Sequence, residues 1–169
     1  AFGTGQHETT QLCIRQLKKY IKPGCKVLDV GTGSGILGIT ALKLGAGEVF
    51  GTDLDENAIT AVLENLDSNG LDPGQFFVMK GNIIDDKQVQ DKAGYECYDI
   101  AVANILADVI IMLQKEIPVH IKKGGIFITS GIINMKEEAV KEAFQANEAF
   151  EIIEITRQGD WVSVTAKKL

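Results

Sequence analysis

The stretch VLDVGTGSGILGI, residues 27–39, decides the fold. Strand-forming residues around one acid, 27–30, lead into three glycines at alternate positions, Gly31, Gly33 and Gly35, and then into the apolar start of a helix. Glycine tolerates positive φ and has no Cβ, so a ligand can lie directly against the backbone of such a turn. The stretch therefore predicts a strand, a tight turn and a helix, with the turn forming a cradle for a ligand.

Two kinds of ligand fit such a cradle. From Gly33 onward the sequence GSGILG also matches the dinucleotide fingerprint G-x-G-x-x-G, and Asp53 follows about 20 residues later, where a ribose-binding acid would lie. Asp29, however, comes at the end of the strand, two residues before Gly31. A pyrophosphate prefers amide N–H groups without a nearby carboxylate, whereas S-adenosylmethionine carries an ammonium and a sulfonium and no phosphate. Asp29 thus favours the cationic ligand; the alternative is a purely structural turn in which Asp29 caps the helix.

The composition describes one soluble globular domain. The chain has 169 residues, of which 45% are hydrophobic and 24% charged, so it can bury a core but gives no reason to expect a second domain. The formal net charge of −6 disfavours direct binding of nucleic acid and favours a basic partner.

Cysteine and histidine usage argues against a disulfide framework and against a metal site. Three widely spaced cysteines predict reduced thiols in the cytoplasm, not a disulfide framework. His7 and His120 have no companion at ligand spacing, so no metal site is expected. Neither a signal peptide nor an apolar run of about 18 residues is present, and secretion and membrane spanning are therefore not implied.

Hydrophobic periodicity predicts alternating strands and helices joined by short links. Such alternation gives a parallel sheet with right-handed crossovers, and a final pair of alternating segments split by RQGD predicts a hairpin. The fold class is α/β: a doubly wound, mostly parallel, seven-stranded Rossmann-like sheet with a terminal antiparallel hairpin. The predicted strands are 27–30, 48–53, 75–79, 98–103, 126–130, 150–156 and 161–167, and the predicted helices are 7–20, 36–44, 55–69, 106–117 and 134–144.

Local signals add detail at the element ends. Asp55 is the expected N-cap of its helix, and Asn134 with Glu137 fits a capping box. The segment 123–125, Lys-Gly-Gly, is expected to be a turn before the fifth strand, and Trp161 is expected to pack at the hairpin rather than in a site.

Three polar residues, Asp29, Asp53 and Asn104, fall at the carboxyl ends of predicted parallel strands, where open sheets collect ligands. The Asp53 carboxylate could accept hydrogen bonds from both hydroxyls of a ribose; the alternative is that Asp53 caps the following helix. A side-chain amide at the tip of a buried strand must find partners, so Asn104 either faces a ligand or is tied to a neighbouring loop.

Two loops complete the predicted site. In GNIIDD, residues 81–86, an adenine edge would be read by Asn82, by Asp85 or by the amide of Ile83. In the first loop, Gly3 and Gly5 with the threonines at positions 9 and 10 offer bare backbone and hydroxyls to a ligand, although the threonines are equally suited to cap the helix.

Taken together, the strand pattern, the cradle, the acid closing the second strand and the terminal hairpin resemble the class I methyltransferases that use S-adenosylmethionine. Three strings narrow the resemblance: AFGTGQHETT at 1–10, VANILAD at 102–108, and SGII at 130–133 followed by a helix and a GDWV hairpin at 159–162. With these the chain resembles the bacterial methyltransferases of ribosomal protein L11, the PrmA type, over essentially its whole length.

That resemblance implies cofactor contacts at Thr10, Gly31, Asp53 and Asn104, to which the cradle and loop add Asp29, Gly33 and Asn82. It also implies an N-terminal substrate-recognition domain, so that residues 1–169 are expected to be a catalytic domain from which that domain is missing. At positions 6 and 8 the chain has Gln and Glu where related sequences often carry Thr and Pro.

The expected chemistry is an in-line displacement, in which alignment supplies most of the acceleration. Asn104 is the expected catalytic residue, accepting N–H bonds of the substrate amine. Methyltransferases of planar amides typically carry Pro-Pro-aromatic after this Asn, whereas this chain has Ile105, Leu106 and Ala107, which favours a flexible amine. We therefore expect an N-methyltransferase of lysine and α-amino groups of a basic large-subunit ribosomal protein. The alternatives are another protein or small-molecule substrate, an NAD-dependent oxidoreductase, and a nucleotide-binding module without catalysis.

Overall fold

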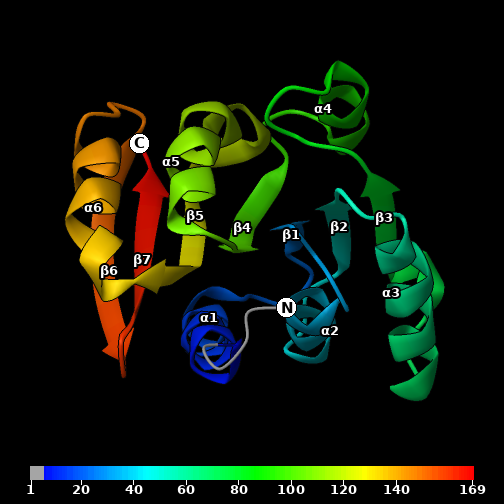
Figure 1. Cartoon of the computed structure of the whole chain (residues 1–169). Helices are drawn as coiled ribbons and strands as arrows, with labels where there is room; N and C mark the ends of the chain where they lie inside the picture. The colour runs from blue at the N-terminus through cyan, green and yellow to red at the C-terminus, as the bar shows by residue number, and fades with distance from the viewer. Residues whose placement is uncertain (1–5) are drawn as a thin grey trace.

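The computed structural model of the protein describes residues 6–169. Within them, seven strands form one sheet in the order β3-β2-β1-β4-β5-β7-β6, flanked by helices on both faces (Figure 1). The strands are β1 (Lys26–Val30), β2 (Glu48–Asp53), β3 (Phe76–Lys80), β4 (Tyr98–Asn104), β5 (Ile121–Ile133), β6 (Phe150–Gln158) and β7 (Trp161–Lys168). The α-helices are α1 (Gln6–Tyr20), α2 (Ile36–Lys43), α3 (Asn57–Ser68), α4 (Lys87–Ala93), α5 (Ala107–Glu116) and α6 (Glu137–Gln145), and the 3-10 helices are η2 (Pro73–Gln75), η3 (Ile117–His120) and η4 (Asn134–Lys136).

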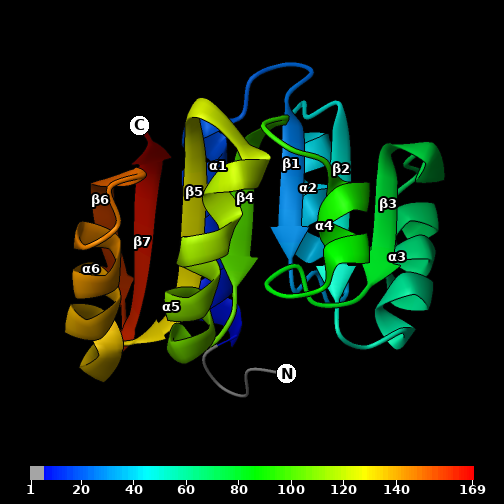
Figure 2. The same cartoon turned by 90° about the horizontal axis from the view of Figure 1, so that it is seen from above.

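The sheet is parallel from β3 to β5 and antiparallel at its C-terminal end. Strands β1 to β5 pair in parallel, whereas β7 runs antiparallel between β5 and β6. Helices α1, α2 and α3 cover one face and α4, α5 and α6 the other, as Figures 1 and 2 show. The predicted fold class is thus confirmed, including the terminal hairpin.

Each face of the sheet carries its own core because successive strand residues point to opposite sides. In β1, Val27 packs with the core under α1, α2 and α3, while Leu28 packs with the core under α4, α5 and α6. In β4, Val102 likewise packs with the core under α1, α2 and α3, and Ala103 with the core under α4, α5 and α6. Full burial of an apolar side chain of this kind stabilises by about 1.5–3 kcal/mol, so both faces hold the strands rigidly. The loops at the strand ends are therefore placed on a firm support.

Two elements differ from the sequence expectation. Helix α4 was not predicted; it is short, its N-cap Asp86 accepts the N–H of Gln88, and only Val89 and Ala93 are buried. Strand β5 begins five residues earlier than expected, and its segment 123–125 lies within the strand instead of forming a separate turn. Tyr98 of β4 pairs with Ile121 of β5, whereas Ile100 pairs with Ile126. Strand β5 therefore has more residues than β4 in this interval, and the register of the pairing shifts there.

The predicted helix caps are only partly present. The capping box of Asn134 and Glu137 is wrong: residue 134 opens η4, α6 has no side-chain cap, and the Glu137 carboxylate accepts hydrogen bonds from Arg157 instead. Asp55 lies one residue before the cap position of α3, yet its Oδ1 accepts the N–H of Asn57 at 2.9 Å. A distant ion pair has thus replaced a local cap at α6.

None of the helices between residues 6 and 169 is both long and apolar enough to cross a membrane. The three cysteines, Cys13, Cys25 and Cys97, are free thiols. Over the same residues, no group of three or more His, Cys, Asp or Glu side chains is gathered as a metal would require.

Candidate functional site

The glycine turn after β1 has the predicted cradle geometry. Gly31, Gly33 and Gly35 all have positive φ, at 72°, 56° and 87°. Its amide groups are already engaged: the N–H groups of Gly31 and Thr32 donate to the carbonyl of Thr52 at 2.8 and 2.9 Å, and that of Gly33 donates to Asp53 Oδ2 at 2.9 Å. A phosphate-binding turn instead leaves such N–H groups free for the anion. This turn is therefore poorly suited to a pyrophosphate.

The cradle lies directly against the end of β4. A Cβ on residue 31 would come within 2.9 Å of Ile105 Cγ2, and one on Gly35 within 2.9 Å of Val62 Cγ2. A Cβ on Gly33, by contrast, would meet no atom within 4 Å. The turn is thus packed on its inner side against β4 and α3 and open at its middle glycine, which leaves bare backbone facing outward.

Asp53 joins the cradle to the end of β2. Its Oδ2 accepts the N–H of Gly33 and its Oδ1 accepts the N–H of Asp55, each at 2.9 Å. A carboxylate oxygen has more than one lone pair, so both oxygens can still accept hydroxyl groups. The structure brings Asp53 and Gly33 together; the contact with a ribose stays a prediction.

Asp29 lies beneath the cradle rather than at its surface. The side chain is only 1% exposed, and it accepts a hydrogen bond from Thr32 Oγ1 at 2.5 Å and another from the backbone N–H of Gly38. Burial, with a smaller contribution from the charge of Asp53, raises its pKa to about 6 against the opposing effect of these two bonds. Its carboxylate thus supports the turn and the first turns of α2, and direct contact with a cofactor stays a prediction.

Asn104 ends β4 with an unsatisfied side chain. It is 8% exposed, and its Nδ2 lies 3.5 Å from Thr10 Oγ1. Its Oδ1 is buried, and no residue that the structure describes donates a hydrogen bond to it. Because buried acceptors are almost always paired, Oδ1 marks a position where a donor from a ligand would be stabilised.

The start of α1 is fixed beside Asn104 by β5. Ser130 Oγ, at the end of the predicted fifth strand, donates to the carbonyl of Thr9 at 2.9 Å, and Ser130 pairs with Asn104 in the parallel ladder. This bond places Thr10 next to the amide of Asn104, and a contact between Thr10 and a cofactor stays a prediction. The glycines at positions 3 and 5 of the first loop lie outside the described residues.

Gly131 is a site residue that the sequence reasoning missed. Its φ is 91°, and a Cβ there would come within 2.4 Å of the carbonyl oxygen of Ile105 and 3.1 Å of Asn104 Oδ1. Only glycine therefore leaves Asn104 in this position. The available signal was the Ser-Gly pair that directly follows the fifth strand.

The loop after β3 reaches the same edge of the sheet. The N–H of Gly81 donates to the carbonyl of Asp53 at 2.8 Å, so Asn82 follows immediately beside the cradle. Asn82 Oδ1 accepts the N–H of Ile84 at 3.0 Å, which stabilises the turn, and Ile83 is buried. The side-chain oxygen of Asn82 is thus occupied within the loop, and an adenine contact there stays a prediction.

An exposed apolar rim adjoins Asn104. Leu106, just before α5, is 64% exposed, and Met135 in η4 is 83% exposed. The ion pair of Lys136 Nζ with Asp108 Oδ1, at 3.4 Å, links the two segments that carry them. Apolar side chains this exposed at a strand end are available to contact a substrate.

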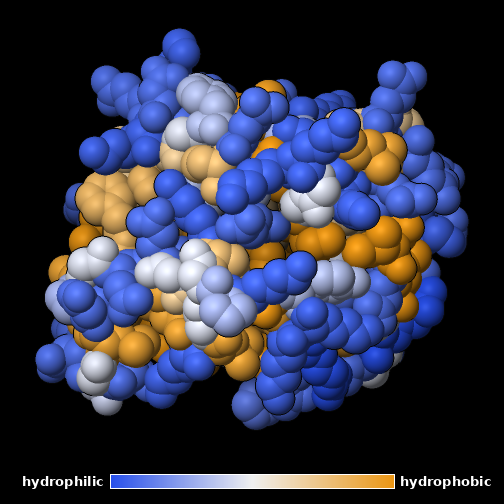
Figure 3. All heavy atoms as spheres, turned by 180° about the vertical axis from the view of Figure 1, so that it is seen from behind, coloured by the Kyte–Doolittle hydropathy of each residue, from blue (hydrophilic) through white to orange (hydrophobic). Residues whose placement is uncertain are grey.

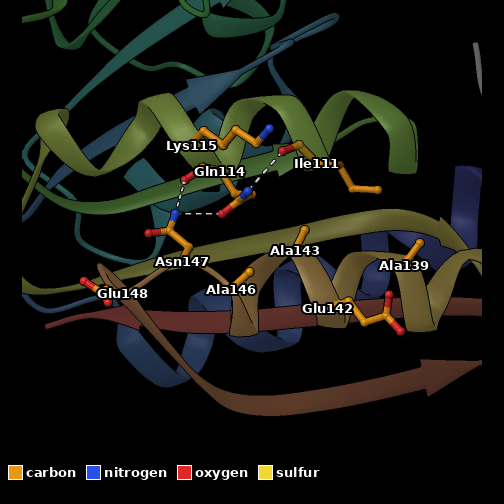
Figure 4. A pocket seen from close by; sticks show the side chains of 9 residues that line it. All are labelled: Ile111, Gln114, Lys115, Ala139, Glu142, Ala143, Ala146, Asn147 and Glu148. Atoms are coloured by element: carbon orange, nitrogen blue, oxygen red, sulfur yellow. Dashed lines mark hydrogen bonds between the residues drawn. The ribbon is translucent and has the colours of Figure 1, made fainter.

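A larger hollow between α5 and α6 lacks comparable features (Figure 4). Its volume is about 720 Å³, and its two buried or half-buried amide side chains, Gln114 and Asn147, are hydrogen-bonded to each other. Asn147 Nδ2 donates to the carbonyl and to Oε1 of Gln114, whose Nε2 donates to the carbonyl of Ile111. The carboxyl edge around Asn104 is therefore the better candidate site.

Known proteins resemble the chain over its full length. The family model described as ribosomal protein L11 methyltransferase (PrmA) matches residues 1–169. The ribosomal protein L11 methyltransferase of Lachnospira eligens is 58% identical over 168 residues, which are 99% of this chain and 53% of that protein. That of Agathobacter rectalis is also 58% identical, over 100% of this chain and 53% of that protein. The chain spans about half the length of the curated relatives it matches.

A solved structure shows the same fold. The crystal structure of ribosomal protein L11 methylase from Lactobacillus delbrueckii subsp. bulgaricus aligns with a TM-score of 0.85 at 34% identity. The alignment covers 96% of this chain and 79% of that one.

Proposed function

The chain belongs to the ribosomal protein L11 methyltransferase (PrmA) family, and from this we propose that it transfers a methyl group from S-adenosylmethionine to lysine and α-amino groups of a ribosomal protein. Residues 1–169 would form the catalytic unit, acting in the cytoplasm, where free thiols such as its three cysteines persist. The observation that carries the proposal is the buried Oδ1 of Asn104 beside the glycine cradle, to which no residue from 6 to 169 donates a hydrogen bond.

The residues present fit S-adenosylmethionine better than a dinucleotide. The amides of Gly31 and Gly33 are engaged with protein oxygens, and the carboxylates of Asp29 and Asp53 lie at or below the turn. Both features disfavour phosphate and suit a ligand with positive charge. We infer that Asp53 holds the ribose, that the cradle backbone and Thr10 hold the amino-acid part, and that Asn82 lies near the adenine.

When bound, that cofactor would supply an activated methyl group on a sulfonium. The chain's own part is to align a neutral amine with it. Asn104 Oδ1 is positioned to accept an amine N–H, which directs the nitrogen lone pair away from the acceptor and fixes its orientation. No general base is required if the amine loses its proton to water, which is easier for an α-amine of pKa about 8 than for a lysine near 10.4.

The substrate assignment is supported by charge and by the apolar rim. A net charge of −6 attracts a basic protein, and Leu106 and Met135 offer apolar surface to the methylene groups of a lysine next to Asn104. The alternative within the same chemistry is another protein or a small amine. An NAD-dependent oxidoreductase is disfavoured by the engaged amides of the cradle.

Two measurements test the proposal. Calorimetric titration should detect binding of S-adenosylmethionine and none of NAD; binding of NAD alone would contradict it. Transfer of labelled methyl to purified large-subunit proteins should fall roughly 100-fold in Asn104→Ala. The control, Asn69→Ala, removes a side-chain bond at the end of α3 and should change the rate less than twofold. An unchanged rate in Asn104→Ala would sink the assigned role of the amide.

A further inference from the structure

At the amino ends of the strands, opposite Asn104, lysines surround one cavity. The cavity has a volume of about 490 Å³ and lies where α1 ends and β5 begins. Its lysines come from segments far apart in the sequence: Lys19, Lys22, Lys122, Lys123 and Lys167. Figure 3 looks onto this edge, where hydrophobic residues (orange) are visible between hydrophilic ones (blue). We call this cavity the lysine pocket; its concentration of positive charge contrasts with a chain of net charge −6.

Three of the five ammonium groups are not neutralised. Lys19 pairs with Glu154 at 2.7 Å and Lys122 with Asp99 at 3.1 Å. The other three lysines, Lys22, Lys123 and Lys167, are exposed and form no ion pair with any residue from 6 to 169.

The neighbouring acid on β6 offsets this positive charge only in part. Glu151 lies opposite Lys167 in the β6–β7 ladder but forms no ion pair with it within the described part of the chain. The positively charged ammonium groups around the pocket repel one another, which costs free energy. A bound anion would relieve this repulsion.

The inner surface of the lysine pocket is largely apolar. Tyr20, Cys25, Ile126 and Ile153 line it together with the lysines. At Gly124 in β5, where φ is 82°, a Cβ would meet no atom within 4 Å, so the pocket is open above this residue. A volume of this size is typical of small-molecule sites, which combine an apolar lining with a few charged groups that fix orientation.

We propose that the lysine pocket binds a phosphorylated organic anion of nucleotide size. Its phosphates would lie among the unpaired ammonium groups of Lys22, Lys123 and Lys167, since lysine binds phosphate as a point charge. Its organic body would pack on Tyr20 and Ile126. The remaining surface carries the excess acid and would repel a long polymer of phosphates, which favours a small anion over nucleic acid. The proposal is independent of methyl transfer because the pocket lies at the opposite edge of the sheet.

Titration of the full chain with ATP at about 50 mM salt tests this, because screening at that ionic strength is weak. We expect saturable binding of ATP, no binding of adenosine at the same concentrations, and no displacement of ATP by S-adenosylmethionine. The triple variant Lys22→Gln, Lys123→Gln, Lys167→Gln should bind ATP at least tenfold more weakly. The matched control Lys43→Gln, Lys92→Gln, Lys115→Gln removes the same charge away from the pocket and should change affinity less than twofold.

Several results would overturn the proposal. These are the absence of saturable ATP binding, equal weakening in both triple variants with unchanged melting temperatures, and competition between ATP and S-adenosylmethionine. Tighter binding of a 5′-phosphorylated single-stranded RNA than of ATP, through the same lysines, would replace the small anion with a nucleic acid. Asn104→Ala should keep ATP affinity unchanged, so that failure here and failure of the methyl-transfer proposal are distinguishable.

Discussion

At the scale of a single residue, Asp53 stabilises the glycine turn and is proposed to contact the cofactor. Its carboxylate holds the N–H groups of Gly33 and Asp55, and in the proposed function it also binds a ribose. Asp53→Ala should therefore weaken S-adenosylmethionine at least tenfold and lower the free energy of unfolding by about 1–2 kcal/mol. Asp55→Ala removes only the bond to Asn57 at the start of α3, at about 1 kcal/mol, and should leave cofactor affinity unchanged. Equal affinity loss in both variants, by calorimetry, would refute the ribose contact.

Asp29 predicts a pH dependence of stability. Its folded-state pKa of about 6 lies above the ordinary value of 3.8 because of burial, so the folded protein holds the proton more tightly than the unfolded chain. Its contribution is therefore most favourable below about pH 4 and is lost as pH rises through about 6. Relative to Asp29→Asn, the wild type should lose up to about 3 kcal/mol of unfolding free energy between pH 4 and 7.5. Urea titrations of both proteins at the two pH values measure this difference; parallel pH profiles would contradict it.

The sequence predicts which residues gather at the site better than it predicts their orientation. Strand ends follow from periodicity and glycine, and so Asp53 and Asn104 are found at one edge. Whether an acid points out or is buried depends on partners such as Thr32 and Gly38, which no local pattern specifies. For the same reason the need for glycine at position 131 emerges only once Ile105 is placed next to it.

At the scale of elements, the junction of β4 and β5 holds the amide of Asn104 in place. A Cβ at residue 131 would lie within 2.4 Å of the Ile105 carbonyl and 3.1 Å of Asn104 Oδ1, at a φ of 91°. Gly131→Ala should therefore lower the free energy of unfolding by about 2 kcal/mol or more and abolish methyl transfer. Gly159→Ala places a Cβ in open space at a φ of 59° and should cost only about 1–2 kcal/mol, with activity retained. Full activity in Gly131→Ala would show that the close approach is not required.

The elements that sequence reasoning missed depend on distant contacts. Helix α4 has only seven residues, too few for a helical stripe to be recognised. The early start of β5 depends on pairing of Ile121 with Tyr98 across the sheet. The capping box at α6 fails because Glu137 finds Arg157, twenty positions away. Long, periodic segments such as α1 and β2 were predicted within one residue because their signals are local.

At the scale of the whole molecule, the first helix is tied to the last hairpin. Thr165 Oγ1 of β7 donates to Gln16 Oε1 of α1 at 3.0 Å, with both side chains buried. Gln16→Ala removes the partner of the buried Thr165 hydroxyl and leaves a cavity where the Gln16 side chain was. The free energy of unfolding should fall by about 2–4 kcal/mol. Arg15→Ala, at the exposed bond to Gln158, should cost less than about 1 kcal/mol.

This tie also predicts how the protein unfolds. Trp161, the only tryptophan, reports on the hairpin, whereas far-ultraviolet circular dichroism reports mainly on the helices. In urea, both signals should change at one midpoint in the wild type, because the buried bond between Gln16 and Thr165 joins α1 to β7 and a domain of this size usually unfolds as one unit. The same single midpoint is expected in Gln16→Ala. Separate midpoints would show that the hairpin unfolds independently.

The start of α1 and the end of β7 lie at opposite edges of the sheet. Helix α1 begins at the carboxyl edge beside Asn104, where Ser130 holds Thr9, whereas β7 runs antiparallel and ends at Lys168 on the other edge (Figure 2). Attachment to a sensor surface through Leu169 would therefore orient every molecule with the edge that carries Asn104 toward the solution. An array built in this way would leave the surface around Asn104 accessible from the solution.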